Sequence, residues 1–262
     1  MKDAVPLAAT VLLLRDTGAN LEVLMITRYA EAAFAGGALV FPGGRLDPED
    51  GAVPMLARCR AVPGADAAQM ALRVCAIRET YEEAGLLLAR AKGREELLTG
   101  RQLADLVSPL ATKFGRPPAF GELVEAGAIE LATELLVPFA HWITPTIRPR
   151  RYDTHFFLAP TPAGQVAAHD GAEAVDSVWV EPGAAAADGA AKRVKMIFAT
   201  RFNLLKLARS KDRNAAFVAA RTAKIVTVCP EHRETPQGTM WCIPIEAGYG
   251  VAEIPIAGET VA

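Results

Sequence analysis

Three carboxylates in the first third of the chain have a spacing that suits metal chemistry. Glu79, Glu82 and Glu83 stand at positions i, i+3 and i+4, so a helix would carry them on one face. Like charges on one face repel and weaken a helix unless a cation neutralises them. A hard divalent cation, which binds oxygen ligands, is the expected neutraliser. A Gly43-Gly44 turn precedes the acids, and this pairing points to diphosphate chemistry.

The helix that would carry these acids has local signals at both ends. Asp66 is the expected N-cap, and Gln69 three residues later completes a capping-box pattern. Gly85 suits the C-terminal position that requires a positive φ. The apolar residues between these ends step by four and three and form one stripe: Met70, Val74, Ile77, Tyr81 and Ala84. We therefore expect the stripe to pack on a core and the acids to face a cleft or solvent.

Taken alone, the run from Arg78 to Glu83 is more typical of a solvated helix face than of a metal site. The neighbouring residues favour a metal site instead, because Phe41-Pro42-Gly43-Gly44 precedes the run and Gly85-Leu86 follows it. Together these segments resemble the Nudix box, whose second half reads Arg-Glu-aliphatic-x-Glu-Glu-x-Gly-aliphatic. The resemblance implies a metal-dependent hydrolase that acts on a nucleoside diphosphate linked to another moiety.

The box is interrupted in this chain. Asp50 takes the place of the first Glu of the pattern, and 27 residues separate it from Arg78 where the pattern has seven. The extra residues, roughly 51–66, contain Pro54 and Pro63 and are expected to form a surface excursion. Interrupted boxes of this kind occur in the branch of Nudix proteins that includes acyl-CoA diphosphatases.

Other segments, which extend the resemblance over roughly residues 6–210, are similar to the same branch. They are Arg28 before the box, His141–Pro145, Arg151–Phe157, Trp179 and Met196–Leu204. Arg28 matches the first Arg of the CoA signature, whereas Ala33 stands where a second Arg would be. CoA or acyl-CoA is therefore the first expected substrate, and ADP-ribose or a dinucleotide is the alternative.

The resemblance also assigns roles to residues. Glu79, Glu82 and Glu83 and the Gly43 carbonyl are the expected ligands of Mg²⁺, for which Mn²⁺ should substitute. The same three glutamates are also the expected catalytic residues, together with Arg78, which would orient them through an ion pair with Asp50. Glu173 is the expected carboxylate from a later loop, although a surface role fits it equally well. The expected substrate-binding residues are Arg28, Gly44 and Arg151.

Composition describes an ordinary globular chain of 262 residues. The net charge is −2 and 51% of the residues are hydrophobic, so nothing indicates a nucleic-acid or membrane partner. No targeting segment and no run of ~20 apolar residues is present, and we expect a cytoplasmic protein with a small nucleotide substrate. Whether it forms a homodimer stays open. The four cysteines are expected to be free buried thiols, and the four scattered histidines to be structural rather than catalytic.

The order of expected elements favours the α/β (α+β) class. Strand-like runs cover 8–15, 21–27, 38–41, 134–143, 152–159, 174–180, 225–229 and 240–245, and helical runs cover 95–113, 120–133 and 204–220. We predict a Nudix-type α/β/α sandwich with a mixed sheet and inserted helices. The expected domain spans 1–220, with insertions at about 51–66 and 93–133. Residues 221–262 form a C-terminal extension packed on it.

Two classes of function fit these observations. The first is a hydrolase of the kind described above. The second is a catalytically silent Nudix-like module that only binds a nucleotide. The intact set of Glu79, Glu82 and Glu83 argues against the second class. A basic cluster over 192–213 fits either a solvated helix or a patch for an additional phosphate, and the sequence does not decide between them.

Overall fold

The computed structural model describes residues 4–18, 20–29, 35–167, 174–236 and 238–255. Its centre is an eight-stranded mixed sheet in the order β10-β7-β8-β1-β2-β3, with β4 paired to β1 and β9 paired to β2. The strands are β1 (Leu7–Thr17), β2 (Asn20–Arg28), β3 (Leu39–Val40), β4 (Gly43–Arg45), β7 (Val137–Ile143), β8 (Asp153–Pro160), β9 (Ala174–Val180) and β10 (Thr227–Val228). β1 runs parallel to β8 and antiparallel to β2, so the predicted hairpin and mixed sheet are both present.

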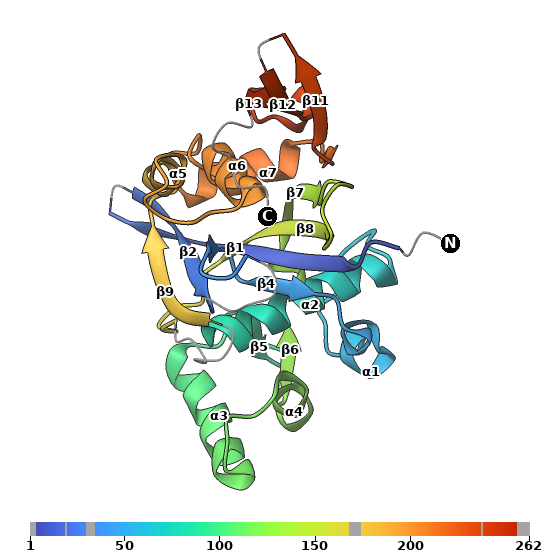
Figure 1. The fold of residues 1–262 in the computed structure, drawn as a ribbon. Coiled ribbons are helices and arrows are strands. Elements are labelled where there is room, and N and C mark those ends of the chain that lie inside the picture. Colours follow the sequence, from blue (N-terminus) through green and yellow to red (C-terminus); the bar gives the residue numbers. More distant parts are fainter. Residues whose placement is uncertain (1–3, 19, 30–34, 168–173, 237, 256–262) are drawn as a thin grey trace.

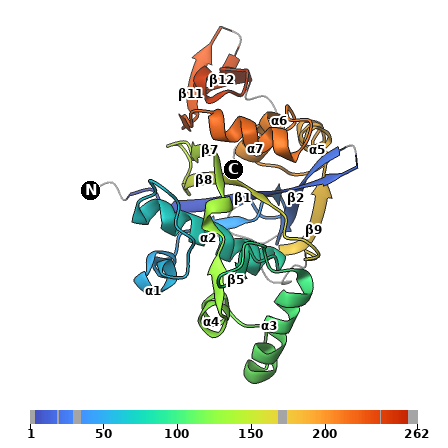
Figure 2. The same ribbon diagram turned by 180° about the vertical axis from the view of Figure 1, so that it is seen from behind.

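Helices cover both faces of the sheet, as Figures 1 and 2 show from opposite sides. One face carries α2 (Ala67–Ala84); the other carries α5 (Pro182–Ala190), α6 (Phe198–Leu207) and α7 (Arg213–Thr222). This arrangement is the predicted α/β/α sandwich. No helix in the described part of the chain is long and apolar enough to cross a membrane.

The apolar run of β1 explains why the sheet needs cover on two sides. Ala9, Val11 and Leu13 enter the core under α2, whereas Leu12 and Leu14 enter the core under α6 and α7. Successive side chains of a strand point to opposite faces, so a strand buried on both faces is apolar throughout. Burying each of these leucines contributes on the order of 2 kcal/mol.

Helix α2 begins and ends where the sequence predicts. The Asp66 side chain accepts a hydrogen bond from the Gln69 backbone, and Gln69 reciprocates, which forms the capping box. Gly85 ends the helix with φ 66°, a left-handed conformation that favours glycine. In the predicted stripe, Val74, Ile77 and Ala84 are buried, and Met70 and Tyr81 are half-buried.

The additions to the sheet differ in part from the expectation. Residues 51–66 contain the short helix α1 (Val53–Leu56), preceded by the 3-10 turn η1 (Pro48–Gly51), and they contact the domain through a bridge between Cys59 and Leu131. The run 95–113 begins as coil, because Thr99 caps α3 (Gly100–Phe114). The run 120–133 is helical only as α4 (Phe120–Ala126); beyond Gly127 it forms β6 (Ile129–Leu131), paired with β5 (Ala89–Ala91), and the 3-10 turn η2 (Thr133–Leu135).

The C-terminal third also departs from the prediction at two points. The single helix expected over 204–220 is two helices, because Asp212 caps α7 and the chain turns after Leu207. The tail forms a second sheet from β11 (Glu231–Thr235), β12 (Gly238–Cys242) and β13 (Glu253–Pro255), preceded by β10 on the main sheet. The polar run of β11 has no apolar alternation, so the sequence pattern missed it. The 3-10 turn η3 (Ile245–Ala247) links β12 to β13.

The four cysteines are free thiols, as expected, but only Cys75 is buried; Cys59, Cys229 and Cys242 are half-buried. Burial raises the pKa of Cys59 to about 12 and that of Cys75 still further, so both thiols are protonated at neutral pH.

Candidate active site

Arg78 is the centre of an ion-pair network on helix α2. Its Nε and Nη2 donate to the two carboxylate oxygens of Asp50 at 2.8 and 3.0 Å, and its Nη1 donates to Glu79 and Glu82 at 2.8 and 2.9 Å. Burial alone would lower the pKa of Arg78, but the hydrogen bonds of Asp50 and the charges of Glu79 and Asp50 raise it well above the usual value. The guanidinium therefore stays charged and fixes the direction of three carboxylates.

Asp50 connects this network to the interrupted part of the box. Its side chain is 1% exposed, and besides Arg78 it accepts a hydrogen bond from the Asp47 backbone at 2.8 Å. That second bond closes a capping box at the start of η1. Asp50 has a shorter side chain than Glu, but it reaches Arg78 because η1 brings the Asp50 backbone close to α2.

Close approach requires both glycines: the Glu79 carboxyl group lies against Gly44, and strand β1 lies against Gly43. A Cβ on Gly44 would lie 2.4 Å from the Glu79 carboxyl group, and a Cβ on Gly43 would lie 2.5 Å from the Ala9 carbonyl oxygen. The Gly43 backbone N–H donates to Glu83 Oε2 at 2.8 Å in a buried position. The strand β4 thereby holds Glu79 and Glu83 against its own backbone.

The three glutamates are not equivalent in their environment. Glu79 and Glu83 are buried, with 8% and 1% of each residue exposed, whereas the Glu82 side chain is 41% exposed. Arg28 Nη1 lies 3.6 Å from Glu83 Oε1, so the predicted Arg28 stands beside the acids. The three glutamates therefore lie on one helix face that is buried at Glu79 and Glu83 and exposed at Glu82.

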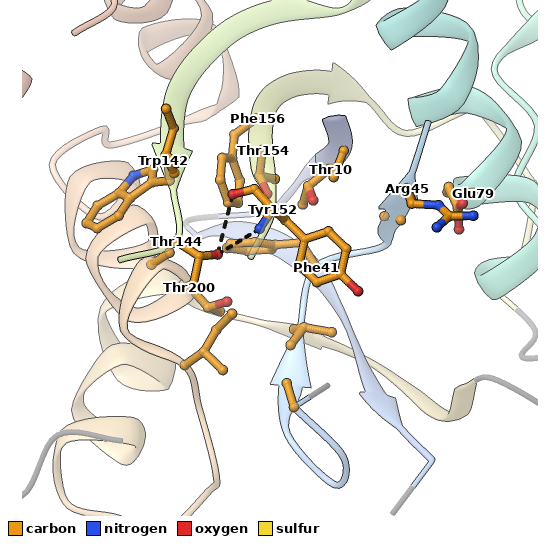
Figure 3. A pocket seen from close by; sticks show the side chains of 18 of the residues that line it. Thr10, Phe41, Arg45, Glu79, Trp142, Thr144, Tyr152, Thr154, Phe156 and Thr200 are labelled. Carbon is orange, nitrogen blue, oxygen red and sulfur yellow. Dashed lines mark hydrogen bonds between the residues drawn. The ribbon is translucent and has the colours of Figure 1, made fainter. Parts of the chain in front are cut away.

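A cavity of about 420 Å³ opens beside these acids. One end is lined by Arg28, Gly43, Gly44, Arg78, Glu79 and Glu83. The other end is lined by aromatic and hydroxyl side chains, several of which Figure 3 labels: Thr10, Phe41, Trp142, Thr144, Tyr152, Thr154, Phe156, Phe198 and Thr200. An end lined by carboxylates and guanidinium groups thus adjoins an end lined by aromatic and hydroxyl side chains in one continuous cleft.

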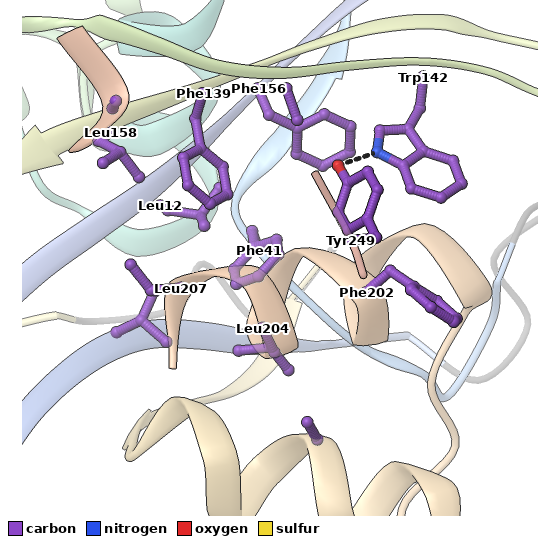
Figure 4. Packing of buried hydrophobic residues seen from close by; sticks show 14 of the residues in the cluster. Leu12, Phe41, Phe139, Trp142, Phe156, Leu158, Phe202, Leu204, Leu207 and Tyr249 are labelled. Atoms are coloured by element: carbon purple, nitrogen blue, oxygen red, sulfur yellow. Dashed lines mark hydrogen bonds between the residues drawn. The ribbon is translucent and has the colours of Figure 1, made fainter. Parts of the chain in front are cut away.

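The C-terminal part of the chain supports the aromatic end. Tyr249 Oη accepts from Trp142 Nε1 at 2.7 Å and donates to Asn203 Oδ1 at 2.8 Å. Figure 4 shows the Trp142–Tyr249 bond inside the core formed by β7, β8 and α6. Lys206 and Arg209 donate to backbone carbonyls of Ala247, Gly248 and Tyr249. These two members of the basic cluster therefore hold the tail in place.

Of the two remaining predicted residues, the structure describes only Arg151. Arg151, expected to bind substrate, is not among the residues that line the cavity; its Nε donates to the Thr144 carbonyl at 2.9 Å. Glu173, the expected later carboxylate, lies outside the described residues. The sequence interpretation did not single out the aromatic end as a wall, because its side chains come from strands and helices far apart in the chain.

Comparison with known proteins agrees with this geometry. The model of the NUDT19 Nudix domain family matches residues 53–207, more than half of the chain. The chain belongs to this Nudix family. Its relatives include acyl-coenzyme A diphosphatase NUDT19 of Xenopus laevis, 24% identical over 64% of the chain and 54% of the relative. The Gallus gallus protein of the same name is 29% identical over 52% of the chain and 47% of the relative.

A crystal structure of a Nudix hydrolase from Alicyclobacillus acidocaldarius has the same fold. It is 27% identical, covers 83% of this chain and 97% of its own, and superposes with a TM-score of 0.68. The Nudix chain described here spans about half the length of the two NUDT19 relatives. The predicted family and fold are thus both confirmed.

Proposed function

We propose that this Nudix protein hydrolyses the diphosphate bond of a nucleoside diphosphate linked to another moiety. CoA or acyl-CoA is the preferred substrate, which yields 3′,5′-ADP and (acyl-)phosphopantetheine. The observation that carries this proposal is the cavity of about 420 Å³ in which buried Glu79 and Glu83 adjoin an aromatic wall. The names of the NUDT19 relatives support the same substrate class.

The donor set at the acidic end fits a hard divalent cation. Glu79, Glu82 and Glu83 supply carboxylates and Gly43 a backbone carbonyl, so every proposed donor is oxygen. The place where a Gly44 Cβ would stand is taken up by the Glu79 carboxyl group. Mg²⁺ is the proposed cofactor, with Mn²⁺ as a substitute. When bound, it neutralises the diphosphate oxygens and lowers the pKa of a water molecule.

The chain's own residues set the direction of these carboxylates. Arg78, clamped by Asp50, orients Glu79 and Glu82, while the Gly43 N–H fixes Glu83. Such prior orientation removes the cost of arranging the ligands during the reaction. Glu173 remains the proposed source of an additional carboxylate for proton transfer.

The apolar end is proposed to receive the organic part of the substrate. Phe41, Trp142 and Phe156 are buried aromatic residues of its wall, and they offer flat apolar surface to a base or a thioester chain. Arg28 and Gly44 border the acids, where the diphosphate would lie. We propose that Arg151 acts on the substrate through Thr144, the cavity residue whose carbonyl it holds.

One assay separates this proposal from its alternatives. The full chain with Mg²⁺ is given CoA, an acyl-CoA, ADP-ribose, NADH and diadenosine polyphosphates at equal concentration, and products are separated by chromatography. We expect 3′,5′-ADP to form from CoA or acyl-CoA fastest. Faster cleavage of ADP-ribose or of a dinucleotide would make that class the substrate. Binding of a nucleotide with no cleavage of any would favour the silent module.

A further inference from the structure

A second cluster of possible ligands lies on β7 and β8, on the side of these strands opposite the one that lines the cavity. His141 of β7 is the cross-strand partner of His155 of β8, and Asp153 stands two residues before His155 on the same strand. Thr154 and Phe156, which alternate with them along β8, line the cavity. Because successive side chains of a strand alternate, Asp153 and His155 point to the same face as Phe157, which packs in the core under α2.

The three side chains converge. The two imidazole rings stack with centroids 4.1 Å apart and planes 19° from parallel. His141 Nε2 is hydrogen-bonded to Asp153 Oδ1, and His155 Nε2 lies 3.7 Å from the same oxygen. One ligand atom from each residue lies within 4.8 Å of the other two, and the side chains are 16 to 33% exposed. The group is thus compact and open to ions from solvent.

A neighbouring strand fixes one of the rings. His141 Nδ1 lies 2.7 Å from the Thr227 hydroxyl of β10, which is the register partner of His141. Metal-binding histidines commonly have their second nitrogen held in this way, which turns the free nitrogen toward the metal. The Thr227 hydroxyl both donates and accepts hydrogen bonds, so it can hold either tautomer of His141.

We propose that His141, Asp153 and His155 form a binding site for a transition-metal dication of the Zn²⁺ class. A site of two imidazole nitrogens and one carboxylate binds Zn²⁺ and Co²⁺ in preference to Mg²⁺. In the bound form a neutral His141 would carry its proton on Nδ1 and donate it to the Thr227 hydroxyl, which leaves Nε2 free to bind the ion. The ion would link β7 and β8 beside β10, and it would brace the sheet without contacting the cavity.

The proposal is independent of the hydrolytic function and is tested without an activity assay. The background protein carries Glu79→Gln and Glu83→Gln, so that the acidic end of the cavity competes less for metal. Chelator-treated full chain is titrated with Co²⁺, followed by visible absorption, and with Zn²⁺, followed by calorimetry. We expect one equivalent of each to bind, a melting temperature raised by about 5 °C in excess Zn²⁺, and no displacement by millimolar Mg²⁺.

Three variants locate the binding. His155→Phe keeps an aromatic ring on the stack but removes a ligand, and we expect at least ~10-fold weaker Zn²⁺ binding. Thr227→Val alters no ligand and should weaken binding by roughly 10-fold. His232→Phe, at an exposed histidine of β11, is the matched control and should bind as the background does. Unchanged affinity in His155→Phe, or no Zn²⁺ binding by the background, would overturn the proposal.

Discussion

The two ends of the cavity are built in different ways. Apart from Arg28, the acidic end comes from one stretch of chain, residues 43–83, in which strand β4, the 3-10 turn η1 and helix α2 are joined by hydrogen bonds. The aromatic end is assembled from β7, β8 and α6, and Tyr249 of the C-terminal tail buttresses it. The acidic end is therefore fixed by local spacing, and the aromatic end depends on tertiary packing.

This difference should separate residues that affect bond cleavage from residues that affect the choice of substrate. Under the proposed function the acidic end would act on the diphosphate of any substrate, so changes there should lower turnover for every substrate. The aromatic end would contact the part of the substrate that differs between CoA and other nucleotides, so changes there should alter the Michaelis constant.

Removal of the divalent cation should have the largest effect. Without it the buried carboxylates Glu79 and Glu83 would repel the diphosphate, and we expect hydrolysis to fall to the detection limit in excess EDTA. Added Mg²⁺ or Mn²⁺ should restore turnover. Full activity in EDTA would refute the metal-dependent mechanism.

Glu83→Gln should lower kcat on the order of 10³-fold, because several kcal/mol of charge stabilisation are lost. Each ~1.4 kcal/mol of lost stabilisation corresponds to a tenfold lower rate. The amide oxygen of the substituted side chain can still accept the Gly43 hydrogen bond, so the fold should persist. Exposed Glu82→Gln is the comparison variant and should lose less. Steady-state kinetics on CoA and a thermal melt check both points. Equal and near-normal turnover in the two variants would mean that these acids take no part in catalysis.

Gly44→Ala should lower turnover by about 10²-fold. The new Cβ would stand 2.4 Å from the Glu79 carboxyl group and displace it, and misplacement of a catalytic group by ~1 Å has this scale of effect. Gly121→Ala in α4, where a Cβ meets nothing within 4 Å, is the matched control and should be neutral. Equal activity of the two variants would contradict the close approach of Glu79 to Gly44.

Tyr249→Phe should have the smallest effect on turnover but a clear one on binding. It leaves Trp142 Nε1 and Asn203 Oδ1 without their buried partner, which should destabilise the fold by about 2 kcal/mol. We expect a melting temperature lower by roughly 5 °C and a several-fold higher Michaelis constant for CoA, with little change in kcat. Exposed Tyr29→Phe should change neither value. A kcat loss as large as that of Glu83→Gln would erase the distinction between the two ends.

The same division explains how much could be predicted from the sequence. Capping residues Asp66 and Gly85 act within one helical turn, so the helix and its acids could be placed from local pattern alone. The Arg78–Asp50 pair was also expected, and it forms across the insertion. The contact of Tyr249 with Trp142, and that of His141 with His155, depend on strand order and register that no local pattern contains. Strand β11, which lacks alternation, was missed for a related reason.

The position of a bound Mn²⁺ ion tests the central claim most directly. Anomalous scattering from crystals of the full chain grown with Mn²⁺ would locate the ion without an assay. We expect a peak about 2 Å from carboxylate oxygens of Glu79 and Glu83 and from the Gly43 carbonyl oxygen. A Mn²⁺ peak only at His141, Asp153 and His155, or none beside α2, would contradict the assignment of the acidic end as the metal site.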